Sequence, residues 1–229
     1  MADRVLVARD HGSSQAAVMK WHDRMGRLAA AIRFRNSQTY WENRYVAGGT
    51  SGVGSYDVQA QYKADFINGF VRESGVASVI EFGCGDGNQL ELAEYPLYLG
   101  IDVAAPAIER CIQSFAQDGS KSFMTYDVRA FADRARFLHA DLALSLDVVF
   151  HLVEDDVFEA YMRALFNAAD RFVIIYARDR DEAPPLKRHV RWRKFTPWVE
   201  RNVTGWKLSQ LEPAPLAEYQ DFHVFARVE

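Results

Sequence analysis

Acidic and glycine residues gather in the run Glu81-Phe82-Gly83-Cys84-Gly85-Asp86-Gly87, and Asp102 follows Gly83 by nineteen residues. Glycines let a backbone come close to a ligand and adopt positive φ where a turn needs it. An acidic side chain about 20 residues further on, at the tip of the next strand, accepts hydrogen bonds from ribose hydroxyls. The residue types and their spacing therefore predict a turn that binds a nucleoside.

The same spacing distinguishes between nucleoside-binding turns. Asn88 stands where the dinucleotide fingerprint G-x-G-x-x-G requires its third glycine, and no G-x-x-x-x-G-K-[ST] loop occurs in the chain. The pattern is instead acidic-x-Gly-x-Gly-x-Gly. A tight turn of purely structural purpose would use the same glycines, so the interpretation depends on the elements around it.

Strands and helices alternate around this turn. The apolar pair Val79 and Ile80 precedes it as a buried strand. This alternation over about a hundred residues predicts an α/β fold with a doubly wound sheet. We expect further strands at 97–102, 121–126, 142–149, 171–176, 206–208 and 222–227, and helices at 57–71, 89–94, 106–115 and 154–169.

The order of these motifs resembles that of the class I S-adenosylmethionine-dependent methyltransferases. The resemblance implies S-adenosylmethionine as cofactor and a Rossmann-like sheet of seven strands, mostly parallel with the last strand antiparallel. It also implies that Asp102 contacts the ribose of the cofactor and Asp127 its adenine amino group. The methionine end of the cofactor would lie against Glu81, Gly83, Cys84, Gly85 and Gly87.

A longer signature narrows the resemblance. The runs 79–90 and 147–155, together with the Tyr-Trp…Ser-Gly stretch upstream, look like a group of small bacterial methyltransferases associated with sugars and cell-surface glycans. We therefore expect O-methylation of a small molecule or a sugar or glycan.

Upstream, aromatic residues precede four glycines between Gly48 and Gly54. Glycine at this density does not hold one conformation by itself, so residues 40–56 are interpreted as a lid that closes over a ligand and excludes water. A flexible connector is the alternative. In the lid interpretation, Tyr40, Trp41 and Arg44 contact the cofactor and Tyr56 the acceptor.

A basic run, 187–195, lies between the fifth and sixth expected strands, where the connection emerges near the carboxyl edge of the sheet. We interpret His189, Arg191 and Arg193 as an acceptor site that recognises a phosphate or carboxylate. A solvated charged loop is the alternative.

His151 follows the fourth strand directly and is the candidate general base, because an imidazole titrates near neutral pH. Asp147, four residues earlier, would orient the acceptor or hold a water molecule. A structural hydrogen bond is the alternative for His151, since methyl transfer also proceeds by proximity and orientation alone.

Composition bounds the remaining choices. With 27 basic and 31 acidic residues, a net charge of −4 and a pI near 5.9, the chain is unlike a dedicated nucleic-acid binder. Two cysteines and scattered histidines indicate neither a disulfide framework nor a metal site, and no apolar run approaches a membrane span, so we expect a cytoplasmic protein.

The 229 residues suffice for one compact domain, with an N-terminal helical and lid extension at 1–74 and the methyltransferase core at 75–229. The helical pattern of Ser14 to Phe34 would cover the sheet or a second subunit, which leaves a homodimer open. One alternative function is a non-catalytic scaffold that binds the cofactor. A protein or nucleic-acid methyltransferase is a second, although the chain has no N-P-P-[YF] motif of the kind that many base methyltransferases use. A nicotinamide-dependent oxidoreductase is a third, which Asn88 disfavours.

Overall fold

The computed structural model describes residues 34–181, 188–216 and 219–228. One compact unit runs from Asn36 to Glu229, so that residues 36–77, which precede the first strand, belong to the same unit as the sheet. The helix expected from Ser14 falls, apart from Phe34, outside the described residues.

The described residues form a seven-stranded sheet in the order β3-β2-β1-β4-β5-β7-β6. The first five strands are mutually parallel, β7 is antiparallel to β5, and β6 is antiparallel to β7. This arrangement confirms the expected doubly wound sheet with an antiparallel last strand. The strands are β1 (Ser78–Phe82), β2 (Leu97–Asp102), β3 (Lys121–Thr125), β4 (Ala140–Leu146), β5 (Ala169–Ala177), β6 (Trp206–Glu212) and β7 (Asp221–Arg227).

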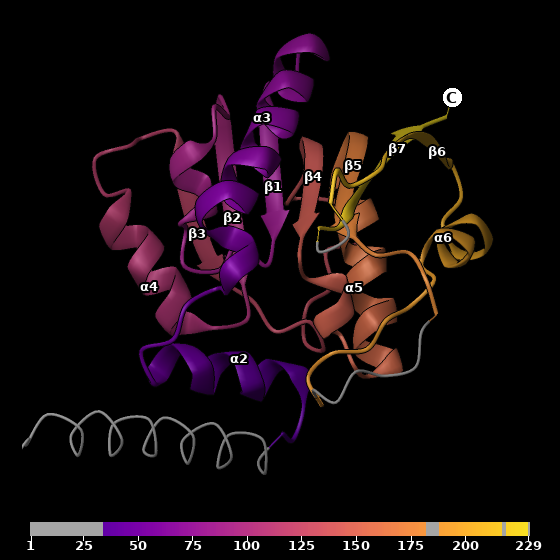
Figure 1. Ribbon diagram of the computed structural model, residues 1–229. Helices are drawn as coiled ribbons and strands as arrows, with labels where there is room; N and C mark the ends of the chain where they lie inside the picture. The colour runs from indigo at the N-terminus through magenta and orange to yellow at the C-terminus, as the bar shows by residue number, and fades with distance from the viewer. Residues whose placement is uncertain (1–33, 182–187, 217–218, 229) are drawn as a thin grey trace, which may run out of the picture. The chain divides into compact units, whose positions relative to one another are not determined.

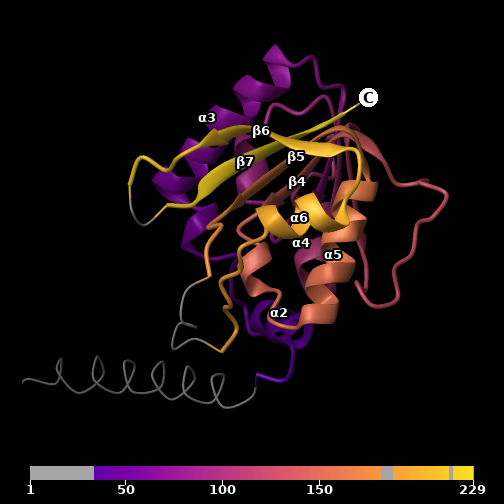
Figure 2. The same cartoon turned by 90° about the vertical axis from the view of Figure 1, so that its right-hand side faces the viewer.

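Helices cover both faces of the sheet (Figures 1 and 2). On one face, α3 (Asp57–Glu73) and α4 (Ala105–Ser114) pack against inward side chains such as Leu142 and Ile174. On the other, α5 (Asp155–Asn167) and α6 (Thr196–Asn202) pack against Ala143 and Ile175. Successive residues of β4 and β5 thus enter opposite cores, which is why both strands are nearly continuous apolar runs.

Helix α2 (Ser37–Val46) crosses the carboxyl ends of the parallel strands (Figure 1). Its Tyr45 is buried against Ala104 and Ala107 at the start of α4, with Trp41 packed beside them. The carboxyl edge is where ligands bind in open α/β sheets. In the described part of the chain, no helix has both the length and the apolar character needed to cross a membrane.

Three expected segments differ from the sequence prediction. Of the lid expected at 40–56, residues 40–46 belong to helix α2 and residues 53–55 form a 3₁₀ turn, η1 (Val53–Ser55). The helix expected at 89–94 is a 3₁₀ turn, η2 (Gln89–Leu92), which ends before the extended residues that lead to Pro96. The fourth strand stops at Leu146 because Asp147 takes a positive φ of 59°, and a second 3₁₀ turn, η3 (Val149–His151), follows.

Candidate active site

The glycine turn after β1 wraps around the end of β2. Gly83, Gly85 and Gly87 have φ values of 82°, 61° and 82°, which glycine adopts without steric cost. The N–H of Gly83 donates to the carbonyl oxygen of Ile101 at 2.7 Å. The N–H of Gly85 donates to Asp102 Oδ2 at 3.0 Å, and Ala104 N–H donates to Oδ1 at 2.9 Å. The turn thereby fixes the direction of the Asp102 carboxylate.

Two buried carboxyl groups belong to the neighbouring strands β1 and β2: Glu81 is paired with Gly100, and Asp102 follows two residues later. Burial raises the pKa of Asp102 to about 6, although the backbone N–H groups of Ala104 and Gly85 oppose the rise. Burial also raises the pKa of Glu81 to about 7, against the opposing effects of the Tyr98 hydroxyl, which donates to Glu81 Oε2 at 2.7 Å, and of Lys63. The site therefore contains two acids that titrate well above their usual range.

Lys63 on α3 is a fully buried cation at the same edge. Its Nζ lies 2.8 Å from Asp147 Oδ2, directly after β4. Nearby, Gln89 is 6% exposed; its Nε2 donates to the carbonyl oxygen of Ala60, while its Oε1 has no hydrogen-bond partner in the structure. A buried polar atom without a partner is costly, and this one belongs to a residue that lines the cavity described below.

The glycine-rich segment lies over the glycine turn. Ser51 donates to Asp86 twice, from its N–H at 3.0 Å and from its hydroxyl at 2.7 Å, and the hydroxyl of Tyr56 donates to Asp86 Oδ2 at 2.9 Å. Arg110 on α4 donates to the carbonyl oxygens of Gly49 and Tyr45. We call this segment, 48–56, the cover segment. Its contacts hold it against the glycine turn, with Ser51 next to Gly85.

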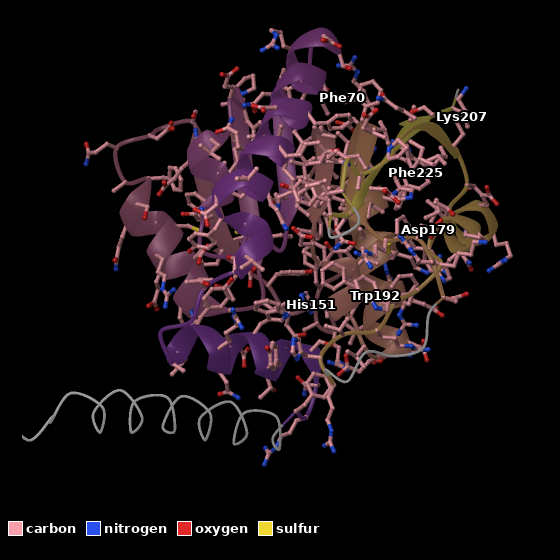
Figure 3. The ribbon with its side chains drawn as sticks, viewed as in Figure 1. Phe70, His151, Asp179, Trp192, Lys207 and Phe225 are labelled. Atoms are coloured by element: carbon pink, nitrogen blue, oxygen red, sulfur yellow. The ribbon has the colours of Figure 1, made fainter. Side chains whose placement is uncertain are left out.

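Aromatic and imidazole rings cluster around His151. His151 Nδ1 lies 2.9 Å from the carbonyl oxygen of His189, and the Trp41 ring meets the His151 ring edge-on at 4.8 Å. Tyr40 stacks on His189 at 4.2 Å. Figure 3 shows His151 at the carboxyl edge, just above α2. Side chains from α2, η3 and the connection after β5, which are distant in the sequence, thus meet around His151.

A cavity lies among these groups. The apolar side chains of Val103, Val128 and Val157 line it, together with Lys63 and Gln89. Eight of the residues predicted from the sequence line it as well: Trp41, Glu81, Gly83, Cys84, Gly85, Asp102, Asp147 and His151.

Comparisons with known proteins agree with this geometry. No family model and no curated protein matches the sequence. Solved structures do match. Magnesium protoporphyrin IX methyltransferase from Synechocystis PCC 6803, with bound S-adenosylmethionine, is 19% identical and has a TM-score of 0.62 over 84% of this chain and 97% of its own. The chain has the class I methyltransferase fold.

Two further methyltransferases support the same fold. N-methyltransferase NodS from Bradyrhizobium japonicum WM9, in complex with S-adenosylhomocysteine, is 16% identical, with a TM-score of 0.61 over 85% of this chain and all of its own. The methyltransferase domain of bacterial CtHen1-C is 18% identical, with a TM-score of 0.61 over 74% of this chain and 98% of its own. At these identities the comparisons establish the methyltransferase fold alone.

Other predicted residues lie near the cavity of this methyltransferase fold without lining it. Gly87 packs on Cys111 and Phe115, and Arg44 donates from Nε to the carbonyl oxygen of Thr50 at 2.6 Å. Asp127 is exposed and accepts from the N–H of Arg129 at 2.8 Å. Tyr40, Tyr56 and His189 make the contacts already described.

The arginines of the basic run are bound to the protein itself. Arg191 and Arg193 donate to the carbonyl oxygens of Val153 and Leu152 and approach Asp155, whose pKa is lowered chiefly by the hydrogen bond from Arg193. Their recognition of an anionic acceptor stays a prediction.

Sequence reasoning missed Lys63 and Gln89. A signal for Lys63 was present, because it falls among Ala60, Ala64, Ile67 and Val71 at helical spacing, on the apolar face of α3. A lysine on such a face needs a buried partner.

Proposed function

We propose that the chain is an S-adenosylmethionine-dependent methyltransferase that methylates a hydroxyl group of a small molecule or of a sugar within a glycan. The observation that carries the proposal is Asp102: a buried carboxylate at the tip of β2, tied to the glycine turn by Gly85 N–H at 3.0 Å, in the wall of the cavity. This is the geometry that receives ribose hydroxyls in nucleoside-binding α/β sheets.

The cavity residues fit the parts of S-adenosylmethionine in order. Asp102 would accept from the ribose. The apolar side chains of Val103, Val128 and Val157, which line the cavity beyond it, would flank the adenine. Asp127 remains the proposed partner of the adenine amino group and would have to turn inward from its exposed position.

The amino-acid end of the cofactor fits the polar side of the cavity. The buried ammonium of Lys63 suits the carboxylate, and the unpartnered Oε1 of Gln89 suits the ammonium. Glu81, Gly83, Cys84 and Gly85 line the same side. The pairing satisfies a buried acceptor that the protein leaves without a hydrogen bond.

When bound, the cofactor supplies a methyl group on a positively charged sulfur. The protein's part is to orient the acceptor, to exclude water and to remove the proton of the acceptor hydroxyl. Cover-segment contacts to Asp86 close the cavity from one side, and α2 closes it from the other.

His151 is the proposed general base. The carbonyl oxygen of His189 only accepts hydrogen bonds, so the contact at 2.9 Å places a proton on His151 Nδ1 and leaves Nε2 as the basic nitrogen. Asp147 acts indirectly, by holding Lys63. Trp41 and His151 line the cavity together and would contact the acceptor ring.

Calorimetric titration tests the proposal, with S-adenosylmethionine and S-adenosylhomocysteine as ligands and NAD as the control. We expect micromolar binding of the first two by the wild-type protein and its loss in Asp102→Ala, which removes the ribose acceptor. Preference for NAD, or no binding of either sulfur nucleoside by a folded wild-type protein, would refute it. Binding followed by failure to methylate a panel of sugars and phosphosugars would favour the non-catalytic scaffold.

A further inference from the structure

Residues 189–193, which precede α6, lie along the segment 150–155, which carries His151. The backbone N–H of Arg191 donates to the carbonyl oxygen of Phe150 at 2.8 Å. Two residues earlier, the carbonyl oxygen of His189 meets His151 Nδ1. The orientation of the imidazole therefore depends on how the two segments are aligned.

Two guanidinium groups strengthen that alignment. Arg191 Nη1 donates to the carbonyl oxygen of Val153 at 2.9 Å, and Arg193 Nη2 donates to the same oxygen at 2.8 Å. Arg193 also donates to the carbonyl oxygen of Leu152 and to Asp155 Oδ1. Charge-assisted hydrogen bonds of this kind are about twice as strong as neutral ones.

Arg193 is built into the protein. Its side chain is 11% exposed, and its guanidinium lies 4.8 Å from the centre of the Phe158 ring on α5. Asp179, after β5, fixes the far end of the same connection by accepting from the N–H groups of Phe195 and Thr196. A side chain with these contacts cannot reach an acceptor without releasing the segment it holds.

We propose that Arg191 and Arg193 are positioning residues: they bind the 150–155 segment and so keep the His189 carbonyl oxygen on His151 Nδ1, which makes Nε2 the basic nitrogen. The inference rests on the proposed function, with His151 as the base. It assigns the basic run a role different from recognition of an acceptor phosphate.

The test reads the tautomer of His151 directly and needs no acceptor. Protein labelled with ¹⁵N-histidine is saturated with S-adenosylhomocysteine at a pH at which the imidazole is neutral, and long-range ¹H–¹⁵N correlations identify the protonated nitrogen. The signals of His151 are assigned by their loss in His151→Asn. The wild-type protein is expected to carry the proton on Nδ1.

The variants separate positioning from general stability. In Arg191→Ala/Arg193→Ala, His151 is expected to change to the Nε2–H tautomer, while S-adenosylhomocysteine binding is retained. Arg193→Lys, which still donates to the same carbonyl oxygens, is expected to keep Nδ1–H. Arg191→Ala, which leaves the more buried arginine in place, is the milder variant should the double variant fail to fold, and we expect it to show the change at smaller amplitude.

Arg171→Ala is the matched control, because Arg171 also donates to two backbone carbonyl oxygens, those of Ser74 and Gly75. It is expected to leave the His151 tautomer unchanged. An Nε2–H tautomer in the wild-type protein, or an unchanged tautomer in folded Arg191→Ala and in the double variant, would overturn the inference. Absence of S-adenosylhomocysteine binding would instead refute the proposed function, and the tautomer comparison would still decide the positioning role in the ligand-free proteins.

Discussion

Lys63 and Asp147 form an ion pair that joins α3 to the end of β4, with Nζ 2.8 Å from Oδ2. The lysine side chain has no exposed surface, whereas 19% of the aspartate side chain is exposed. Asp147 has a φ of 59°, a strained conformation for a residue with a side chain. Strain of this kind persists where the surroundings over-determine it, and the ion pair with Lys63 is part of those surroundings.

The ion pair leads to a prediction about which part of the cofactor Lys63 recognises. Lys63→Met should weaken S-adenosylhomocysteine binding by roughly tenfold to a hundredfold, the range expected when a hydrogen bond to a charged group is lost. Binding of 5′-methylthioadenosine, which lacks the amino-acid end, should be unchanged. Calorimetry on both ligands measures the difference. Lys207→Met is the matched control, since Lys207 is exposed on β6 (Figure 3). An equal loss for both ligands would contradict the assignment.

The buried carboxyl group of Glu81 predicts a pH dependence of stability. Its pKa is raised to about 7 by burial, so the native state holds its proton over a range in which the unfolded chain has lost it. Stability from this group is therefore full below the unfolded value near 4.5 and is lost as pH rises to about 7. The loss amounts to about 3 kcal/mol at most.

Glu81→Gln provides the comparison, because the amide keeps an acceptor for the Tyr98 hydroxyl without ionising. Urea unfolding of both proteins at pH 5 and pH 8 measures the effect. Relative to the variant, the wild-type protein should lose free energy of unfolding at the higher pH. A parallel pH dependence of the two proteins would mean that Glu81 titrates in its ordinary range.

The sequence predicted the sheet and the glycine turn because both depend on local patterns. Gly83, Gly85 and Gly87 are needed for the positive φ of the turn, and the chain distance to Asp102 follows from one strand-to-strand crossover. The apolar runs of β4 and β5 follow from burial on both faces.

The remaining features of the site depend on contacts between distant segments. Nothing in the run around Ser51 indicates that it would bind Asp86, thirty-five residues later. Similarly, a basic run has the same composition whether it is solvated or, like Arg193, inserted among carbonyl oxygens. Lys63 was the exception, since its place on an apolar helix face was visible in the sequence.

The cover segment packs closely on the glycine turn, and this leads to a prediction about the stability and ligand affinity of Gly85→Ala. A Cβ at Gly85 would collide with Ser51 Oγ, and the φ of 61° would be strained for alanine. Gly85→Ala should therefore both destabilise the protein and displace the cover segment, lowering S-adenosylhomocysteine affinity by at least about tenfold, which corresponds to roughly 1.4 kcal/mol. Thermal unfolding and calorimetry report the two effects separately.

Gly69→Ala is the matched control for this substitution. Gly69 lies within α3, and a Cβ there would meet nothing within 4 Å. Alanine is favoured over glycine in a helix interior by about 1 kcal/mol, so this variant should be more stable than the wild-type protein and bind the ligand equally well. Unchanged ligand affinity in Gly85→Ala would show that the cover segment does not enclose the cavity.

The hydrogen bonds of Asp86 to the cover segment lead to a prediction about the dissociation rate of the ligand. Burial raises its pKa, but the hydrogen bonds from Ser51 and Tyr56 outweigh burial, and the net shift is downward, so the carboxylate is charged and holds the cover segment at neutral pH. Asp86→Ala removes all of these bonds and should increase the dissociation rate of S-adenosylhomocysteine more than it changes the association rate, because closure acts after the encounter. Stopped-flow displacement measures both rates.

Asp118→Ala is the control, since Asp118 accepts comparable hydrogen bonds from Ser120 and Lys121. Equal dissociation rates in the wild-type protein and Asp86→Ala would favour a connector over a lid.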